Sequence, residues 1–377
     1  MARYVNMKPL LDIPAHYRLM VGERSNGKSY AVLDYHLDKF IKSGYTEPLA
    51  IVRRWEEDFR GANSQKTCYD SLCHNGDGKN VIKEKTDGIF EGVEYYNGRY
   101  YLTQMEEQKD GTKKQVRTSY IIAYAFSINA SEHYKGAQFP TITTILFDEF
   151  ITQSQYLPDE FTLFMNLIST IIRQRDNLEV FMCANTISKY CPYIKEMGLT
   201  KFKSQAVGTI DTYTYGQSDL KVALFLTDSA PKSTKKSNVY FAFNNPKLNM
   251  ITGGDSIWQM GIYPHAPIKF SHTDDVVFKY WIVFDNEEYQ CEIVQKNNYL
   301  FTFIHPHTTK DKHEDTDIIF NTEQVLDNYH QYSLVRSNLP SEFISKILLF
   351  YKSKQVYYSD NTTGNAIASY LEYIKTA

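Results

Sequence analysis

No apolar run in the sequence approaches the roughly 20 residues that a bilayer-spanning helix needs. The first residues, MARYVNMKPLLDIPAHY, also lack the apolar core of a signal peptide. The five cysteines include no C-x-x-C pair, which favours reduced thiols in a cytoplasm. The net charge is only −3, so any binding of nucleic acid must depend on local basic patches. We therefore expect a cytosolic protein that does not contact a membrane.

A phosphate-binding loop is the strongest motif that is present. The stretch MVGERSNGKSYA has the spacing G-x-x-x-x-G-K-S, with its glycines at Gly22 and Gly27. An apolar run precedes it and apolar residues at helical spacing follow it as far as Ile41, which predicts a strand, the loop and a helix. Lys28 is then expected to reach phosphate oxygens and Ser29 to ligate Mg²⁺. The residues expected to bind the nucleotide from this loop are Gly22, Glu23, Arg24, Ser25, Asn26, Gly27, Lys28 and Ser29.

Two adjacent carboxylates follow another predicted strand, residues 144–147. Asp148, at the carboxyl end of that strand, is suited to hold Mg²⁺. Glu149 beside it can act as the base or the positioning group for a hydrolytic water. Small kinases usually lack a glutamate at this position, so the pair favours hydrolysis. The alternative is a strand end with two solvated acids.

Three further polar residues follow predicted elements. The strand 178–184 ends at Asn185, which could contact a γ-phosphate if this strand lies between the other two. The helical segment 160–176 closes with Arg173 and Arg175. An arginine at this helix end can project to the nucleotide of a neighbouring subunit, as an arginine finger does. The alternative is that both arginines favour the dipole at the helix C-terminus.

These motifs, in this order, resemble a known family. MVGERSNGKSYA, LAIVRRW, KGAQFPTITTILFDEFI, MNLISTIIRQRDNLEVFMCANTIS and CPYI are similar to the DNA-packaging ATPase of phi29-like tailed phages. The resemblance covers about residues 15–215. It implies an α/β P-loop ATPase domain of the additional-strand catalytic-glutamate type, with a mainly parallel sheet and a relationship to large terminases.

The resemblance also implies a function. Members of this family use ATP and Mg²⁺ to move double-stranded DNA, working as a homo-oligomeric ring, expected to be a pentamer, at the portal of an empty procapsid in the host cytoplasm. Arg173 matches the trans-acting finger of the family best and Arg175 second, while Arg24 matches an arginine that such motors often carry in the loop. Family members also bind a packaging RNA through parts outside these motifs.

Three segments are predicted in the chain. Residues 1–215 form the ATPase domain, with a hairpin insertion at about 61–140 whose turns are Asn97-Gly98 and Asp110-Gly111. This insertion is either an oligomer contact or a surface elaboration, and its basic tip is expected to be solvated. Residues 216–270 are a turn-rich linker or lid. Residues 271–377 are a smaller α+β domain, in which three strands with short turns precede two helices.

That C-terminal pattern suits an RNase H-like fold, in which terminases keep their nuclease. Asp285 closes the first strand as a nuclease aspartate would, but Asp315 and Asp317 lie in a polar loop and are not convincing partners. We therefore expect a vestigial, inactive nuclease. His305, His307 and His313 stand beside lysines and are expected to be solvated surface residues rather than metal ligands.

Competing functions remain open from the sequence. Within the motor class they are a helicase or a HerA-like DNA pump. A P-loop kinase acting on a small molecule and a non-hydrolysing nucleotide switch or capsid component belong to different classes. Stimulation of ATP hydrolysis by double-stranded DNA separates the motors from the rest.

Overall fold

In the computed structural model the chain forms two compact units. The first unit comprises Met1–Gln153 and Asp159–Ser237, and the second comprises Ser154–Pro158 and Asn238–Ala377. No helix among the described residues is long and apolar enough to cross a membrane. The structure describes residues 5–23, 26–59, 67–74, 78–152, 156–185, 191–216, 218–227, 263–285, 287–307, 318–321, 330–331 and 341–376.

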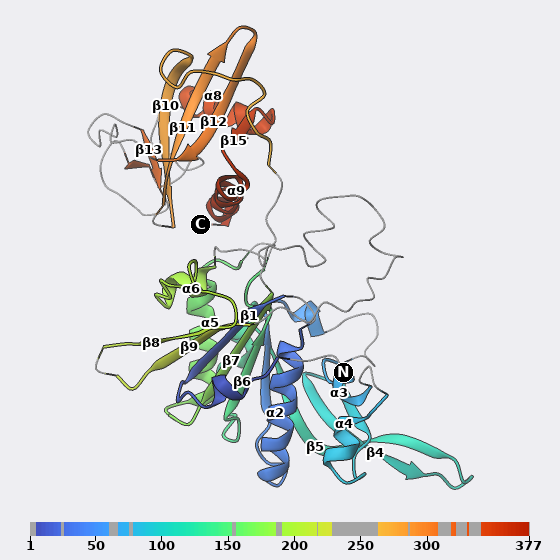
Figure 1. Ribbon diagram of the computed structural model, residues 1–377. Helices are drawn as coiled ribbons and strands as arrows, with labels where there is room; N and C mark the ends of the chain where they lie inside the picture. Colours follow the sequence, from blue (N-terminus) through green and yellow to red (C-terminus); the bar gives the residue numbers. More distant parts are fainter. Residues whose placement is uncertain are drawn as a thin grey trace. The chain divides into compact units, whose positions relative to one another are not determined.

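A nine-stranded sheet with the order β3-β4-β5-β2-β6-β7-β1-β9-β8 forms the first unit (Figure 1). Neighbouring strands from β5 through β9 run parallel, and antiparallel strands close both edges. β7 lies between β1 and β6, which is the arrangement that the resemblance implies. The strands are β1 Tyr17–Gly22, β2 Leu49–Arg53, β3 Gly92–Tyr96, β4 Arg99–Glu107, β5 Lys113–Ser127, β6 Thr144–Asp148, β7 Glu179–Asn185, β8 Ile210–Thr214 and β9 Lys221–Leu226.

Helices cover both faces of this sheet. Side chains alternate between the faces of a strand, and the neighbours Leu146 and Phe147 show which helix lies on each side. Leu146 belongs to the core cluster of α2, whereas the ring of Phe147 lies 4.9 Å from that of Phe164 on α5. The helices are α1 Lys8–Leu11, α2 Lys28–Lys42, α3 Asp70–Cys73, α4 Val81–Lys85, α5 Glu160–Ile172 and α6 Pro192–Glu196, with the 3-10 turns η1 Glu56–Phe59 and η2 Ser131–Tyr134.

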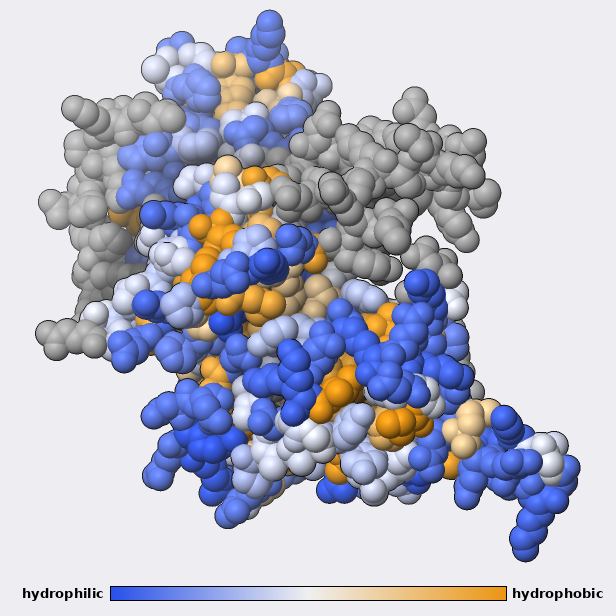
Figure 2. Space-filling model, turned by 60° about the horizontal axis from the view of Figure 1, so that its bottom comes forward, coloured by the Kyte–Doolittle hydropathy of each residue, from blue (hydrophilic) through white to orange (hydrophobic). Residues whose placement is uncertain are grey.

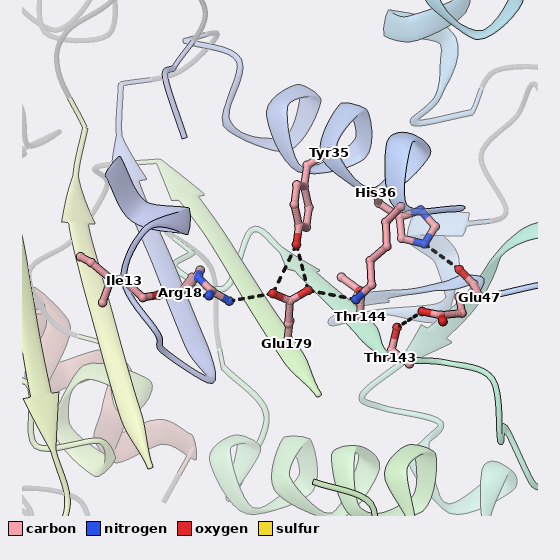
Figure 3. A network of polar contacts seen from close by, with 9 residues as sticks. Ile13, Arg18, Tyr35, His36, Glu47, Thr143, Thr144 and Glu179 are labelled. Atoms are coloured by element: carbon pink, nitrogen blue, oxygen red, sulfur yellow. Dashed lines mark hydrogen bonds and ion pairs between the residues drawn. The ribbon is translucent and has the colours of Figure 1, made fainter. Parts of the chain in front are cut away.

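A network of polar contacts fastens α2 at the amino end of the sheet (Figure 3). The carboxylate of Glu179, the first residue of β7, lies 3.2 Å from Nη1 of Arg18 on β1 and 3.0 Å from Nζ of Lys39 on α2. Tyr35, one turn earlier on α2, donates its hydroxyl to the same carboxylate. Burial, reinforced by the charge of Glu179, raises the pKa of Tyr35 to about 12. These contacts hold the C-terminal half of α2, and thereby orient its N-terminus at the carboxyl ends of the parallel strands.

The predicted insertion is only partly a surface feature. Its two turns form where expected, with Asn97 and Gly98 both at positive φ and Gly111 at +78°. The first half of β5 is mostly exposed, and the ribbon that it makes with β4 protrudes as a largely hydrophilic arm (Figure 2). The second half of β5 is mostly buried and pairs with β2 in the centre of the sheet. The segment therefore contributes to the core as well as to the surface.

The second unit is built on a six-stranded sheet with the order β14-β13-β10-β11-β12-β15. β10, β11 and β12 form the predicted antiparallel meander, and β13 and β15 add parallel to its two edges. Its elements are β10 Val276–Phe284, β11 Glu287–Lys296, β12 Tyr299–Pro306, β13 Ile319–Asn321, β14 His330–Gln331, α8 Ser341–Lys352, β15 Val356–Tyr358 and α9 Asn361–Thr376. The RNase H-like assignment stays a prediction.

One observed strand lies outside the segment that is predicted to form the first domain. β9 lies wholly after residue 215, inside the segment expected to be a linker or lid, yet it belongs to the first sheet. Residues 228–262 of that expected linker lie outside the described residues, as do His313, Asp315 and Asp317. The division of the chain at 215 and 270 stays a prediction.

Candidate nucleotide-binding site

The phosphate loop connects β1, which ends at Gly22, with α2, which begins at Lys28. Gly27 adopts φ +85°, a left-handed conformation that side chains other than glycine rarely tolerate. At Gly22 an added Cβ would lie 1.8 Å from Oγ1 of Thr227, the residue after β9, so glycine is required there by space rather than by dihedral angle. Arg24 and Ser25 lie outside the described residues.

Lys28 extends its buried side chain back across the loop. Its Nζ donates to the carbonyl oxygens of Gly22 at 3.1 Å and Glu23 at 2.7 Å, and to Oδ1 of Asn26 at 2.9 Å. Burial lowers the pKa of Lys28 to about 8, although nearby anionic groups, Asp148 among them, oppose the shift. A buried ammonium whose charged form is disfavoured by desolvation gains from an anionic ligand, and phosphate oxygens supply that charge.

Ser29 and Asp148 meet across the space between α2 and β6. Oγ of Ser29 donates to Oδ1 of Asp148 at 2.6 Å. A hydroxyl and a carboxylate oxygen are the hard ligands that Mg²⁺ takes in nucleotide sites, with phosphate oxygens and water completing its shell. The donor set that the sequence predicts for the metal is therefore brought together, and it fits the ion.

Glu149 follows Asp148 in a strained conformation. Its φ of +65° is unusual for a residue with a side chain. Its N–H donates to the carbonyl oxygen of Cys183 on β7 at 2.7 Å, and its own carbonyl accepts from Arg54. Arg54 is in turn bound by the buried carboxylate of Glu160, at 2.7 Å. The main chain of Glu149 is thus held on both sides, while its side chain is 62% exposed.

Arg53, the last residue of β2, has no role in the sequence-based prediction, yet it contacts both carboxylates. Nη2 lies 2.7 Å from Oδ2 of Asp148, and Nη1 lies 3.0 Å from Oε2 of Glu149. A signal for this contact exists in the sequence, because β2 ends in arginine and β6 ends in acids. The two strands would have to be known as parallel neighbours for that signal to be used.

Asn185, the last residue of β7, lies at the same carboxyl end of the parallel strands. Its Oδ1 is 3.4 Å from Nζ of Lys28. Because β7 lies between β1 and β6, the side chain stands between the loop and the acidic pair. This is the location that the sequence predicts for a residue contacting the γ-phosphate.

The two arginines after α5 lie at the opposite end of the sheet, where the parallel strands begin. α5 ends at Ile172, earlier than the predicted 176. Arg175 donates to five carbonyl oxygens of its own chain, which belong to Phe139, Pro140, Ile142, Ile171 and Ile172. Arg173 is exposed, adopts φ +37° and donates to the carbonyl of Ala137 at 3.0 Å. The fold does not bring either arginine to the loop of its own subunit.

In the second unit, the prediction that His305 and His307 are solvated is wrong. His305 belongs to β12 and His307 directly follows that strand, and their side chains are 14% and 11% exposed, respectively. His307 pairs with Glu288 through Nδ1 at 2.9 Å. Asp285 lies at φ +54° in the turn after β10, and among the residues that the structure describes it joins no group of three potential metal ligands.

The loop between β1 and α2, the acidic pair after β6 and the inserted strand β7 together define a P-loop ATPase fold, here followed by a second unit. A family model described as podovirus DNA encapsidation protein (Gp16) matches residues 94–206. The DNA packaging protein of Bacillus phage phi29 is 26% identical over 193 residues, 50% of this chain and 48% of the relative. That of Bacillus phage B103 is 27% identical over 185 residues, 48% of this chain and 47% of the relative.

The chain thus spans about half the length of the curated relatives it matches. A solved chain of the bacteriophage phi29 viral genome packaging motor assembly aligns over 100% of both chains, with 19% identity and a TM-score of 0.54. That likeness shows a shared fold. The resemblance to phi29-like DNA-packaging proteins that the motifs predict is confirmed.

Proposed function

We propose that this protein is an ATP-driven motor subunit that packages double-stranded DNA into a phage procapsid. The observation that carries the proposal is the 2.6 Å contact between Ser29 and Asp148, which joins the phosphate loop to a strand end that also bears Glu149. This arrangement occurs in a chain whose relatives are DNA packaging proteins.

Each residue of the site has a role in hydrolysis. The loop N–H groups and Lys28 bind the phosphates, and Asn185 contacts the γ-phosphate. Ser29 and Asp148 would hold Mg²⁺, which neutralises charge on the phosphate oxygens when bound. Glu149 accepts a proton from the attacking water. Arg53, paired with both carboxylates, positions them relative to each other.

A neighbouring subunit completes the site through Arg173. Arg175 is a weaker candidate for the arginine finger because its guanidinium already donates hydrogen bonds to backbone carbonyls of its own chain. Arg173 is exposed at the edge of the sheet far from its own loop, as a group acting in trans would be. A ring of such subunits, expected to be a pentamer, would act at the portal in the host cytoplasm. Binding of a packaging RNA rests on the resemblance alone.

The test is the rate of ATP hydrolysis by the purified chain with and without double-stranded DNA. A DNA pump hydrolyses ATP faster when DNA is added, and Glu149→Gln removes both the basal and the stimulated rate. Hydrolysis that ignores DNA, or transfer of the γ-phosphate to a small molecule, would contradict the proposal.

A further inference from the structure

Two histidines and a glutamate converge in the second unit, and none of them belongs to the proposed ATPase site. His272 precedes β10, Glu292 lies in β11 and His305 lies in β12. One ligand atom from each lies within 4.8 Å of the others. Two imidazoles and a carboxylate are a donor set that proteins use for metal ions.

The register of the meander places these side chains on one face. Gln290 lies directly opposite His305, and Glu292 is two residues further along β11. The side chains of Gln290, Glu292 and His305 therefore lie on the same face of the sheet. The imidazole of His272 reaches this face beside Phe303, with ring centroids 5.9 Å apart. The side chain of Glu292 is only 1% exposed. A carboxylate as buried as this one needs a compensating positive charge.

The hydrogen bond from His305 to the main chain fixes which of its ring nitrogens faces the carboxylate. Nδ1 lies 2.8 Å from the carbonyl oxygen of Pro306. Because a carbonyl can only accept, Nδ1 carries a proton, and Nε2 holds a lone pair whenever the ring is neutral. Nε2 is buried without a hydrogen-bond partner and lies 3.7 Å from Oε1 of Glu292, too far for a hydrogen bond. In the neutral form of the ring two acceptors face each other, and a cation between them, either a metal ion or a proton, satisfies both.

The surrounding contacts orient the ligands. Nε2 of Gln290 donates to Oε1 of Glu292 at 2.7 Å, and the bond from His305 to Pro306 holds that ring in place. Hydrogen bonds of this kind position the ligands of metal sites. Nδ1 of His272 lies 2.5 Å from Oε2 of Glu292. Lys279 approaches Oε1 only to 3.9 Å and is 37% exposed, so its ammonium can withdraw into water when another cation binds.

We propose that His272, Glu292 and His305 bind a divalent transition metal of the zinc type. Two nitrogens, one carboxylate oxygen and a water in the fourth position form a ligand set that zinc uses. Mg²⁺ and Ca²⁺ prefer all-oxygen sites, which excludes them here. The side chain of His272 is 55% exposed and can move into coordinating distance while the two strand residues stay in place. The bound ion would fasten the segment before β10 to the meander.

The rival explanation is a proton on Nε2 of His305, which would make an ion pair with Glu292 without any metal. Co²⁺ titration of the full chain separates the two. Protein without a histidine tag is stripped with a chelator, and visible absorbance then reports Co²⁺ bound to nitrogen and oxygen ligands. We expect one equivalent of Co²⁺ to bind and Zn²⁺ to displace it. His272→Ala should weaken this binding at least roughly a hundredfold, more than loss of an outer-shell contact does.

His307→Ala is the matched control. It removes a histidine that lies two residues after His305, just beyond β12, and whose imidazole pairs with Glu288 instead, so it should leave the affinity for Co²⁺ unchanged. His305→Ala and Glu292→Gln should behave like His272→Ala, and the exposed His272 carries the test if either buried variant fails to fold. A wild-type chain that binds no Co²⁺, or binding that survives in His272→Ala, would overturn the proposal.

Discussion

Both ends of the first sheet carry charged side chains, but the two ends differ in how these side chains are paired. At the amino end, the carboxylate of Glu179 is bonded by Arg18, Tyr35 and Lys39, and its side chain is 26% exposed. At the carboxyl end, Glu149 is 62% exposed on a strained backbone and pairs with Arg53. Groups saturated by their own chain stabilise the fold, whereas exposed and strained groups are arranged for a ligand. Variants of Glu179 and of Glu149 should therefore fail in opposite ways, the first in stability and the second in hydrolysis.

The largest effect is expected from Arg173, which is an exception to this contrast. It lies at the amino end of the sheet, but its side chain is exposed. A finger acting on a neighbour's γ-phosphate contributes roughly a thousandfold or more in rate. Arg173→Ala should therefore bind ATP normally, lose hydrolysis by about that factor, and keep its melting temperature. Mixing Arg173→Ala with Glu149→Gln subunits should restore part of the ATPase rate, since some interfaces then pair an intact finger with an intact glutamate.

Arg175→Ala is the matched comparison for that experiment. Losing donors to five backbone carbonyls should lower the melting temperature. If mixing restores nothing and Arg173→Ala is itself destabilised, the arginine only caps its helix. If Arg173→Ala hydrolyses ATP normally, the finger is Arg175 or lies elsewhere.

Glu149→Gln sharpens the contrast from the carboxyl end. The amide cannot take a proton from water, so hydrolysis should fall at least roughly a hundredfold while ATP still binds with Mg²⁺. Lys28→Ala should instead weaken ATP binding itself, which equilibrium binding of a fluorescent nucleotide measures. Near-normal turnover in Glu149→Gln would move the base to another residue, and unchanged affinity in Lys28→Ala would refute the loop assignment.

His36, in α2 near the amino end, should make stability depend on pH. Burial lowers its pKa to about 4, although Nε2 bonds to the carbonyl oxygen of Glu47 at 3.0 Å. Below pH 6.5 the unfolded chain takes up a proton that the folded chain refuses, so stability falls until the pH reaches about 4. The loss attributable to this group is at most roughly 3 kcal/mol.

Chemical denaturation at several pH values measures that loss. His36→Leu should flatten the pH dependence between those limits, even if the variant is less stable throughout. His133→Gln, which changes an exposed histidine, should leave the curve as in the wild type. A curve with the same slope in His36→Leu would assign the pH dependence to other groups.

The smallest effect is expected from Glu179→Gln. The amide keeps an acceptor for Tyr35 but removes the charge that balances Arg18 and Lys39, which should cost about 1–2 kcal/mol of unfolding free energy. The rate of ATP hydrolysis at low temperature should stay normal, because the site lies at the other edge of the sheet. Glu132→Gln, in an exposed pair with Lys135, should change stability by less than about 0.5 kcal/mol. A loss of hydrolysis without a loss of stability in Glu179→Gln would end the contrast.

The sequence predicts the phosphate loop with its strand and its helix, because the three are contiguous and carry a strict spacing. The additional strand and the position of Asn185 also follow from local pattern, helped by the resemblance. Arg53 does not follow, since its contact with Asp148 and Glu149 depends on which strand lies beside β6. Neighbour relations in a parallel sheet are set by crossover connections, which local periodicity does not encode.

The second unit shows the same limit more sharply. The meander is predictable from short strands and turns, but the surroundings of His305 are not. A histidine two residues from another in a polar segment has the same local pattern whether it is solvated or buried. Only the register with β11 shows that His305 meets Glu292, and only the fold of the preceding segment adds His272.

Thr227 sets a limit on the order in which this protein becomes functional. Its N–H donates to the carbonyl of Val21, and its hydroxyl accepts from Asn26 while occupying the space beside Gly22. The phosphate loop is therefore braced by a residue that leaves the ribosome about 200 residues after it, as the separation of 201 between Asn26 and Thr227 records. A nascent chain released at residue 215 would carry every motif of the ATPase and still lack the brace. Nucleotide binding should begin during synthesis only after β9 has been translated and has paired with β1.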